Sequence, residues 1–226
     1  MTITVHDNVT QGSDEWIKMR CGLLTASEMK LILTPTLKVA NNDKTRAHAY
    51  ELAFQRITGF VEPQYVSDAM LRGQEDEYYA RHEYEQHFAK VEQVGFITNC
   101  RWGFTIGYSP DGLVGESGLI ECKSRAGKYQ VQTIASDEVP EEYTLQLQTA
   151  LLVTGREWID FISYCGGLPM YVRRVEPDPE IQEAIIAAAT KFEERVAEIE
   201  QQYRSTLSAM PKVIPTERRE GMDIII

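Results

Sequence analysis

Apolar residues recur every three or four positions in several early stretches of the chain, which predicts amphipathic helices. The first three stretches cover residues 13–20, 25–33 and 43–58. Ser13 suits a helix N-cap, residues 25–28 fit a capping box, and Gly59 suits a helix stop. The N-terminal part of the chain is therefore expected to be helical.

A longer helical pattern covers residues 67–89, and two charged residues lie on its apolar face. That face carries, in order, Met70, Gly73, Glu77, Arg81, Tyr84 and Phe88. A charge on an inward face needs a partner, because burying it alone is costly. Arg81 is the ordinary partner of Glu77 at this i, i+4 spacing, and a metal ion is the alternative.

From residue 94 onward, short apolar segments bounded by turn residues predict strands at 94–98, 103–108 and 118–123. Helices are expected at 126–135 and 141–153, followed by a hairpin of strands 157–165 and 170–175. A final helix begins near Asp178. This order favours an α/β or α+β fold with a mixed central β-sheet flanked by helices.

The length of 226 residues suits one domain. We expect N-terminal helices at 13–90, a sheet region at 91–176, and a C-terminal helix and tail at 177–226. Residues 224–226 form an apolar end that would dock on its own domain or on a neighbouring subunit. With no run of roughly 18 apolar residues and no secretory signal pattern, a cytoplasmic protein without membrane contact is expected.

The formal net charge is −11, which counts against binding nucleic acid, since phosphate contacts favour basic proteins. The objection is limited, because a nuclease needs positive potential only along the strand, and metal ions supply part of it. The four cysteines are widely spaced, which argues against a zinc knuckle or a clustered iron–sulfur site.

The most informative segment is the predicted strand 118–123. Alternate side chains share a face of a strand, so Glu121 and Lys123 point the same way, roughly 7 Å apart at their Cα atoms. Asp111 follows Ser109-Pro110, and turn residues 115–118 allow a hairpin that brings it to Glu121. Taken separately, the pair could be a surface ion pair, and Asp111 an ordinary turn aspartate.

Two convergent carboxylates beside a backbone carbonyl provide the oxygen ligands that Mg²⁺ and Mn²⁺ prefer. A neighbouring lysine can orient or deprotonate water, or neutralise a developing charge. Gln148 borders Leu147 and Leu151 on its predicted helix, where it could hold a water or a phosphate, or simply be partly buried.

An aspartate followed about ten residues later by E-x-K is the signature of the PD-(D/E)XK nucleases, present here as Pro110-Asp111 and Glu121-Cys122-Lys123. The chain more closely resembles the phage lambda exonuclease, or viral-recombinase (YqaJ-like), branch of that family. Four stretches carry the resemblance in the family's order: 16–20 with 25–28, 73–77, 109–112 with 121–123, and 146–148.

The resemblance implies a restriction-endonuclease-like core and a role for each matching residue. Asp111, Glu121 and the main-chain carbonyl of Cys122 would hold one divalent ion, and Glu77 would help hold a second. Lys123 would position or activate the attacking water, which Gln148 would help orient. Arg20 with Ser27 would bind the 5′-terminal phosphate, although Arg20 also fits a solvated helix end.

The activity implied is Mg²⁺-dependent 5′-to-3′ digestion of double-stranded DNA ends, with Mn²⁺ as a possible substitute and two ions in the site. The 3′ single strands left behind would serve phage-type DNA recombination by strand annealing. The resemblance further implies a ring-shaped homotrimer and an annealing recombinase as partner. The alternatives are a PD-(D/E)XK endonuclease of repair or restriction, and a non-catalytic interaction domain.

Overall fold

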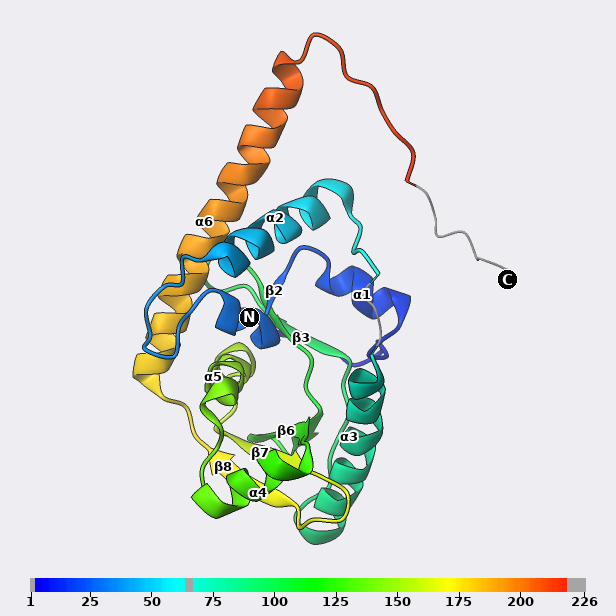
Figure 1. Ribbon diagram of the computed structural model, residues 1–226, viewed down its shortest axis with the longest axis vertical. Coiled ribbons are helices and arrows are strands. Elements are labelled where there is room, and N and C mark those ends of the chain that lie inside the picture. Colours follow the sequence, from blue (N-terminus) through cyan, green and yellow to red (C-terminus); the bar gives the residue numbers. More distant parts are fainter. Residues whose placement is uncertain (1–2, 64–66, 219–226) are drawn as a thin grey trace, which may run out of the picture.

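The computed structural model describes residues 3–63 and 67–218 of the chain (Figure 1). Its strands are β1 (Ile3–His6), β2 (Leu24–Thr25), β3 (Phe96–Asn99), β4 (Ile106–Tyr108), β5 (Gly112–Val114), β6 (Gly118–Ser124), β7 (Trp158–Tyr164) and β8 (Tyr171–Val175). Its helices are α1 (Asp14–Arg20), the 3-10 helix η1 (Ala26–Leu31), α2 (Asp43–Thr58), α3 (Asp68–His87), α4 (Gly127–Ser136), α5 (Glu141–Thr154) and α6 (Pro179–Ala209).

The strands form two four-stranded mixed sheets, with the orders β1-β3-β4-β2 and β5-β6-β7-β8. Strands β2 and β4 pair in parallel, as do β6 and β7, and the other neighbours are antiparallel. The expected α+β fold with mixed sheet structure and flanking helices is confirmed, but the sheet is divided in two. Strand β1 precedes the first expected helix, in residues for which no element was predicted, and β2 lies within the region 13–90 that was expected to be helical.

Side-chain caps define the beginnings of several helices. The Ser13 side chain accepts a hydrogen bond from the Trp16 amide, and Ser67 accepts one from the Met70 amide. The capping box between Thr25 and Glu28 is present, although the segment that follows is a 3-10 helix rather than the expected α-helix. Gly59 ends α2 in the left-handed conformation at φ 64°, which glycine adopts at little cost.

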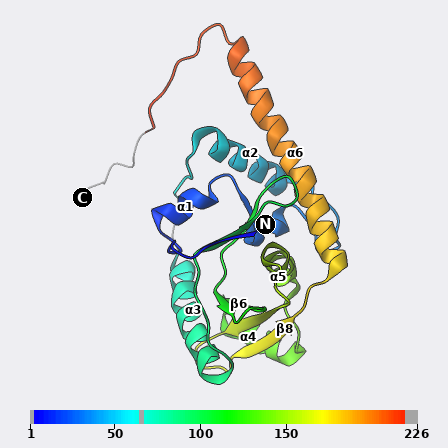
Figure 2. The same cartoon turned by 180° about the vertical axis from the view of Figure 1, so that it is seen from behind.

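Helix α5 lies in the middle of the molecule (Figures 1 and 2). It packs against η1, α6 and strands from both sheets, so its surface is buried on almost every side. The main core consists of buried side chains from α5, α2, α6 and both sheets. They include Leu52, Ile106, Leu119, Leu151, Phe161 and Val196. Since burial of apolar surface drives folding, this core joins the two sheets into one packed body.

Helix α3 covers the opposite face of β6, where Ala80 and Tyr84 pack on Ile120 and Cys122. The expectation of an inward stripe along all of α3 is wrong at both ends, because Met70 is 47% exposed and Phe88 is 57% exposed. The buried side chains of α3 are Ala80 and Tyr84, and Arg72 adds a polar contact to Ser124 of β6 nearer the start of the helix.

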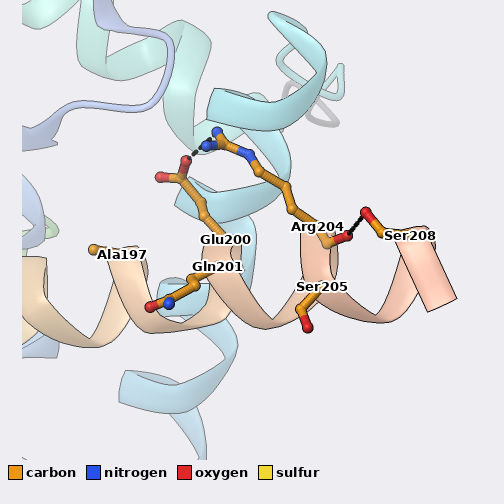
Figure 3. A pocket seen from close by; sticks show the side chains of 6 residues that line it. All are labelled: Ala197, Glu200, Gln201, Arg204, Ser205 and Ser208. Atoms are coloured by element: carbon orange, nitrogen blue, oxygen red, sulfur yellow. Dashed lines mark hydrogen bonds and ion pairs between the residues drawn. The ribbon is translucent and has the colours of Figure 1, made fainter.

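Helix α6 runs past α2 and extends beyond the rest of the protein (Figures 1 and 2). Its buried side chains end at Ile199. Figure 3 shows a surface pocket on the following turns, where Arg204 pairs with Glu200 at 3.0 Å. The apolar end at residues 224–226 lies outside the described residues. None of the described helices is both long enough and apolar enough to cross a membrane.

An ionic network around the buried Asp160 ties α3 to β7 and β8. The Tyr84 hydroxyl donates to Asp160 Oδ2 at 2.7 Å, and Arg174 donates to both Asp160 oxygens at 2.9 Å. The Arg174 guanidinium stacks on the Trp158 ring, with its Cζ 3.5 Å from the ring centroid. Asp160 therefore fixes α3 against the second sheet.

Replacing Asp160 with alanine leaves the Tyr84 hydroxyl and the Arg174 guanidinium without their acceptor. We expect Asp160→Ala to lower the free energy of unfolding by about 2–3 kcal/mol, measured by urea denaturation. Glu198 pairs with Arg195 on the exposed surface of α6, so Glu198→Ala serves as the control, with a loss below about 0.5 kcal/mol. Equal losses in the two variants would contradict a fixing role for Asp160.

Candidate active site

Asp111 and Glu121 face each other across the β5–β6 hairpin. The antiparallel register pairs Gly112 with Ile120, and its continuation by one residue places Asp111 opposite Glu121. Asp111 Oδ2 accepts a hydrogen bond from the Cys122 amide at 2.6 Å. The two carboxylates expected to converge are thus brought together by the strand register.

Glu121 is 2% exposed, and donors from three elements surround its carboxylate. Lys123 Nζ lies 2.7 Å from Oε1, and Gln146 Nε2 from α5 lies 2.5 Å from the same oxygen. The Tyr108 hydroxyl from β4 donates to Oε2 at 2.8 Å. Each donor offsets part of the cost of burying the charge.

The Glu77 side chain on α3 is linked through Arg81 to the turn that carries Asp111. Arg81 Nη1 donates to Glu77 Oε1 at 2.9 Å and to the main-chain oxygen of Asp111 at 3.2 Å. The ordinary i, i+4 partner expected for Glu77 is therefore present, and it also holds the turn that carries Asp111. Glu77 is close enough to act electrostatically on the Asp111 carboxyl.

Burial and the crowding of acidic groups together determine the electrostatics of the site. Burial, followed by the charges of Glu121 and Glu77, raises the pKa of Asp111 well above its usual value. Burial opposes the charge of Lys123, but attraction to Glu121 and Asp111 outweighs it, so the pKa of Lys123 is raised. In this arrangement Lys123 is a cation near neutral pH and holds Glu121 by a charge-assisted hydrogen bond.

The donor chemistry fits a divalent cation, since mutually repelling carboxylates are the hard oxygen ligands that such ions take. Among the described residues, no three acidic, histidine or cysteine side chains are already arranged as ligands. Glu77 and Glu121 are instead occupied by the nitrogen donors of Arg81, Lys123 and Gln146. An ion entering here would have to replace some of these hydrogen bonds.

The Gln148 side chain contacts the start of α6 and not the carboxylates of the site. Its Nε2 donates to the Glu176 carbonyl at 2.8 Å, and its Oε1 accepts from the Asp178 amide at 2.8 Å. Gln148 thus secures the start of α6, and Gln146 is the glutamine that contacts Glu121. Positions two apart on a helix face different directions, so only one of these two side chains can reach the carboxylates.

Arg20 and Ser27 belong to a polar cluster next to Asp111. Arg20 Nη1 donates to Ser109 Oγ at 3.1 Å, and the guanidinium stacks on Trp16 with its Cζ 4.4 Å from the ring centroid. Trp16 Nε1 also donates to Ser109 Oγ, at 3.0 Å. Ser109 stands two residues before Asp111, so the cluster adjoins the carboxylates.

The hydroxyl group of Thr25 joins Ser27 to this cluster. Thr25 Oγ1 lies 3.3 Å from Ser27 Oγ and 3.4 Å from Arg20 Nη2. Sequence reasoning gave Ser109 and Thr25 no role of their own in this cluster. Both lie in stretches that carry the family resemblance, and Thr25 also begins the predicted capping box.

The raised pKa of Asp111 gives a stability prediction. A folded-state pKa above the unfolded value means that ionised Asp111 destabilises the fold, increasingly as pH rises from the unfolded-state value through the folded-state one. Asparagine keeps the acceptor for the Cys122 amide without the charge. We expect Asp111→Asn to raise the Tm of the metal-free protein by roughly 2–6 °C at about pH 8.

The same comparison at about pH 4 is the control, because protonation of Asp111 removes the difference between the two proteins. Thermal unfolding followed by circular dichroism measures both. A variant that melts below the wild type at both pH values would show that Asp111 is not a repelled charge.

Residues 15–157 match the YqaJ-like viral recombinase domain family. An alkaline exonuclease from Laribacter hongkongensis is 31% identical, with a TM-score of 0.72 over 86% of this chain and 100% of that chain. A phage-related exonuclease from Haemophilus somnus, 14% identical with a TM-score of 0.55 over 80% of this chain and 96% of that chain, shares the fold.

The uncharacterized protein YqaJ of Bacillus subtilis is 32% identical over 82 residues. That segment is 35% of this chain and 25% of the Bacillus protein, so the chain spans only a quarter of this curated relative. The family match, in contrast, covers more than half of the chain. The chain therefore belongs to the YqaJ-like viral recombinase domain family.

Proposed function

We propose that this protein is a divalent-metal-dependent deoxyribonuclease that digests double-stranded DNA from its 5′ ends. One observation carries the proposal: the Asp111, Glu121 and Lys123 side chains meet beside the Arg20–Ser109 cluster. The family match and the 31% identity to an alkaline exonuclease support a nuclease that acts on DNA.

Asp111, Glu121 and the main-chain carbonyl of Cys122 would hold one Mg²⁺ or Mn²⁺ ion, and Glu77 would help hold a second. When bound, such ions stabilise the attacking and leaving oxygens of a phosphodiester. Lys123 contributes a positive charge at the carboxylates, since its raised pKa keeps it protonated. Gln146 holds Glu121 and is better placed than Gln148 to orient a water molecule.

Arg20, Ser27 and Ser109 suit the terminal 5′-phosphate, because a guanidinium and hydroxyl groups are typical phosphate donors. The Thr25 hydroxyl donates to Glu28 Oε2 at 2.6 Å instead. Anchoring the phosphate two residues from Asp111 would fix the strand end relative to the carboxylates. The Laribacter exonuclease has been solved in complex with dAMP, a nucleotide that carries such a phosphate. Digestion would therefore proceed from the end rather than internally.

Further properties of the family belong to the same proposal. Digestion in the 5′-to-3′ direction would leave 3′ single strands for an annealing recombinase in a phage-type recombination system of the bacterial cytoplasm. A ring-shaped homotrimer would line its hole with basic residues and keep its acidic surface outside. That arrangement would reconcile the net charge of −11 with DNA binding.

The proposal predicts that, with Mg²⁺ present, linear duplex with a 5′-phosphate is digested faster than the same duplex with a 5′-hydroxyl. Arg20→Ala should reduce this preference by about 10- to 100-fold, since a hydrogen bond to a charged group contributes about 1.5–3 kcal/mol. Release of nucleotides from end-labelled duplex measures both rates.

Arg101, stacked on Trp102 with its Cζ 4.8 Å from the ring centroid, provides the matched control. Arg101→Ala should keep the phosphate preference. Lys123→Ala should abolish digestion of either substrate. Cleavage of intact circular duplex would contradict the exonuclease and favour an endonuclease, and activity that survived Lys123→Ala would refute the assigned site.

A further inference from the structure

The Arg81 guanidinium occupies the space between α3 and the turn that carries Asp111. Its Nη1 bridges Glu77 Oε1 and the Asp111 main-chain oxygen, and the side chain is 14% exposed. With its amide oxygen turned toward the guanidinium, Gln93 accepts from Arg81 Nη2 at 3.0 Å. Three acceptors from separate segments therefore hold Arg81 in place.

The same guanidinium also lies near Cys122. Its charge counteracts part of the pKa increase that burial and the neighbouring carboxylates impose on the Cys122 thiol. Arg81 is thus close to Glu77, Asp111 and Cys122, which are three of the residues expected to hold ions. In the metal-free protein, Arg81 provides the positive charge in this part of the site.

We propose that Arg81 is the resident counter-cation of Glu77 and competes with a divalent ion for that carboxylate. Arg81 thereby determines how tightly the Glu77-dependent ion binds. The inference rests on the proposed metal-dependent nuclease. It adds a positioning residue that competes with the ion for Glu77 Oε1, the oxygen already occupied by Nη1.

Repulsion between the Arg81 guanidinium and a divalent cation is the physical basis of this competition. A guanidinium and a divalent cation that contact the same carboxylate repel each other, so Arg81 at Glu77 Oε1 weakens the binding of an ion to Glu77. Displacing Arg81 also breaks its hydrogen bond to the Asp111 main-chain oxygen. An ion held by Asp111 and Glu121 meets Lys123 instead, so the effect of Arg81 should be confined to the Glu77-dependent ion.

Mn²⁺ binding to the full chain without DNA tests the inference, followed by isothermal titration and by the electron paramagnetic resonance of free Mn²⁺. In Arg81→Met, the Glu77-dependent ion should bind about three- to tenfold more tightly than in the wild type, because its competitor is gone. Adding Glu77→Gln to this variant should remove that ion and leave the ion held by Asp111 and Glu121.

Arg204 pairs with Glu200 at the same i, i+4 spacing on α6 and supplies the control, since Arg204→Met should leave both affinities unchanged (Figure 3). Arg81→Lys keeps the charge in a side chain less suited to bridging two acceptors, so an affinity between those of wild type and Arg81→Met is expected. Circular dichroism verifies folding, and Arg81→Lys decides the question if Arg81→Met does not fold.

Weaker or unchanged Mn²⁺ binding in a folded Arg81 variant would overturn the inference and leave the proposed function standing. Such weakening would mean that Arg81 preorganises Glu77 for the ion instead of competing with it. If the wild type bound no Mn²⁺ that depends on Asp111, the proposed function would be refuted and this inference with it.

Discussion

Repulsion between buried carboxylates is the constraint on which the rest of the site depends. The β5–β6 register sets Asp111 opposite Glu121 inside the protein, and Glu77 adds a third negative charge from α3. Buried charges of one sign persist only where donors or cations compensate them. The surrounding elements supply that compensation, and each contributes a different group.

The compensating groups come from four elements, so the site depends on how those elements pack. Tyr108 comes from β4, Lys123 from β6, Gln146 from α5 and Arg81 from α3. Helix α5 is placed by the main core, whereas α3 is held by a smaller cluster and by the Asp160 network. The geometry of the site is therefore a balance of internal hydrogen bonds, some of which a bound ion would replace.

Local signals in the sequence predicted much of the structure because they act over a few residues. The cap at Ser13 and the stop at Gly59 were predictable from the chemistry of single residues. Alternation along β6 predicted that Glu121 and Lys123 share a face, and Lys123 Nζ lies 2.7 Å from Glu121 Oε1. The family resemblance correctly identified the YqaJ-like viral recombinase domain family.

Other features depend on contacts distant in the sequence and escaped prediction. Strand β2 has two residues and β5 three, too few to display a period of their own. The choice between Gln146 and Gln148 depends on the rotation of α5 relative to β6, which the neighbouring residues leave open. The exposed ends of α3 likewise follow from how far the second sheet extends beneath that helix.

The proposed chemistry requires that the facing carboxylates of Asp111 and Glu121 bind a divalent cation. Diffraction from crystals soaked in Mn²⁺, with anomalous scattering collected near the manganese edge, locates any such ion. We expect a manganese peak between the Asp111 and Glu121 carboxylates, next to the Cys122 main-chain oxygen, and no such peak in Asp111→Asn. Manganese bound only elsewhere, or a peak that persists unchanged in Asp111→Asn, would contradict the proposed chemistry.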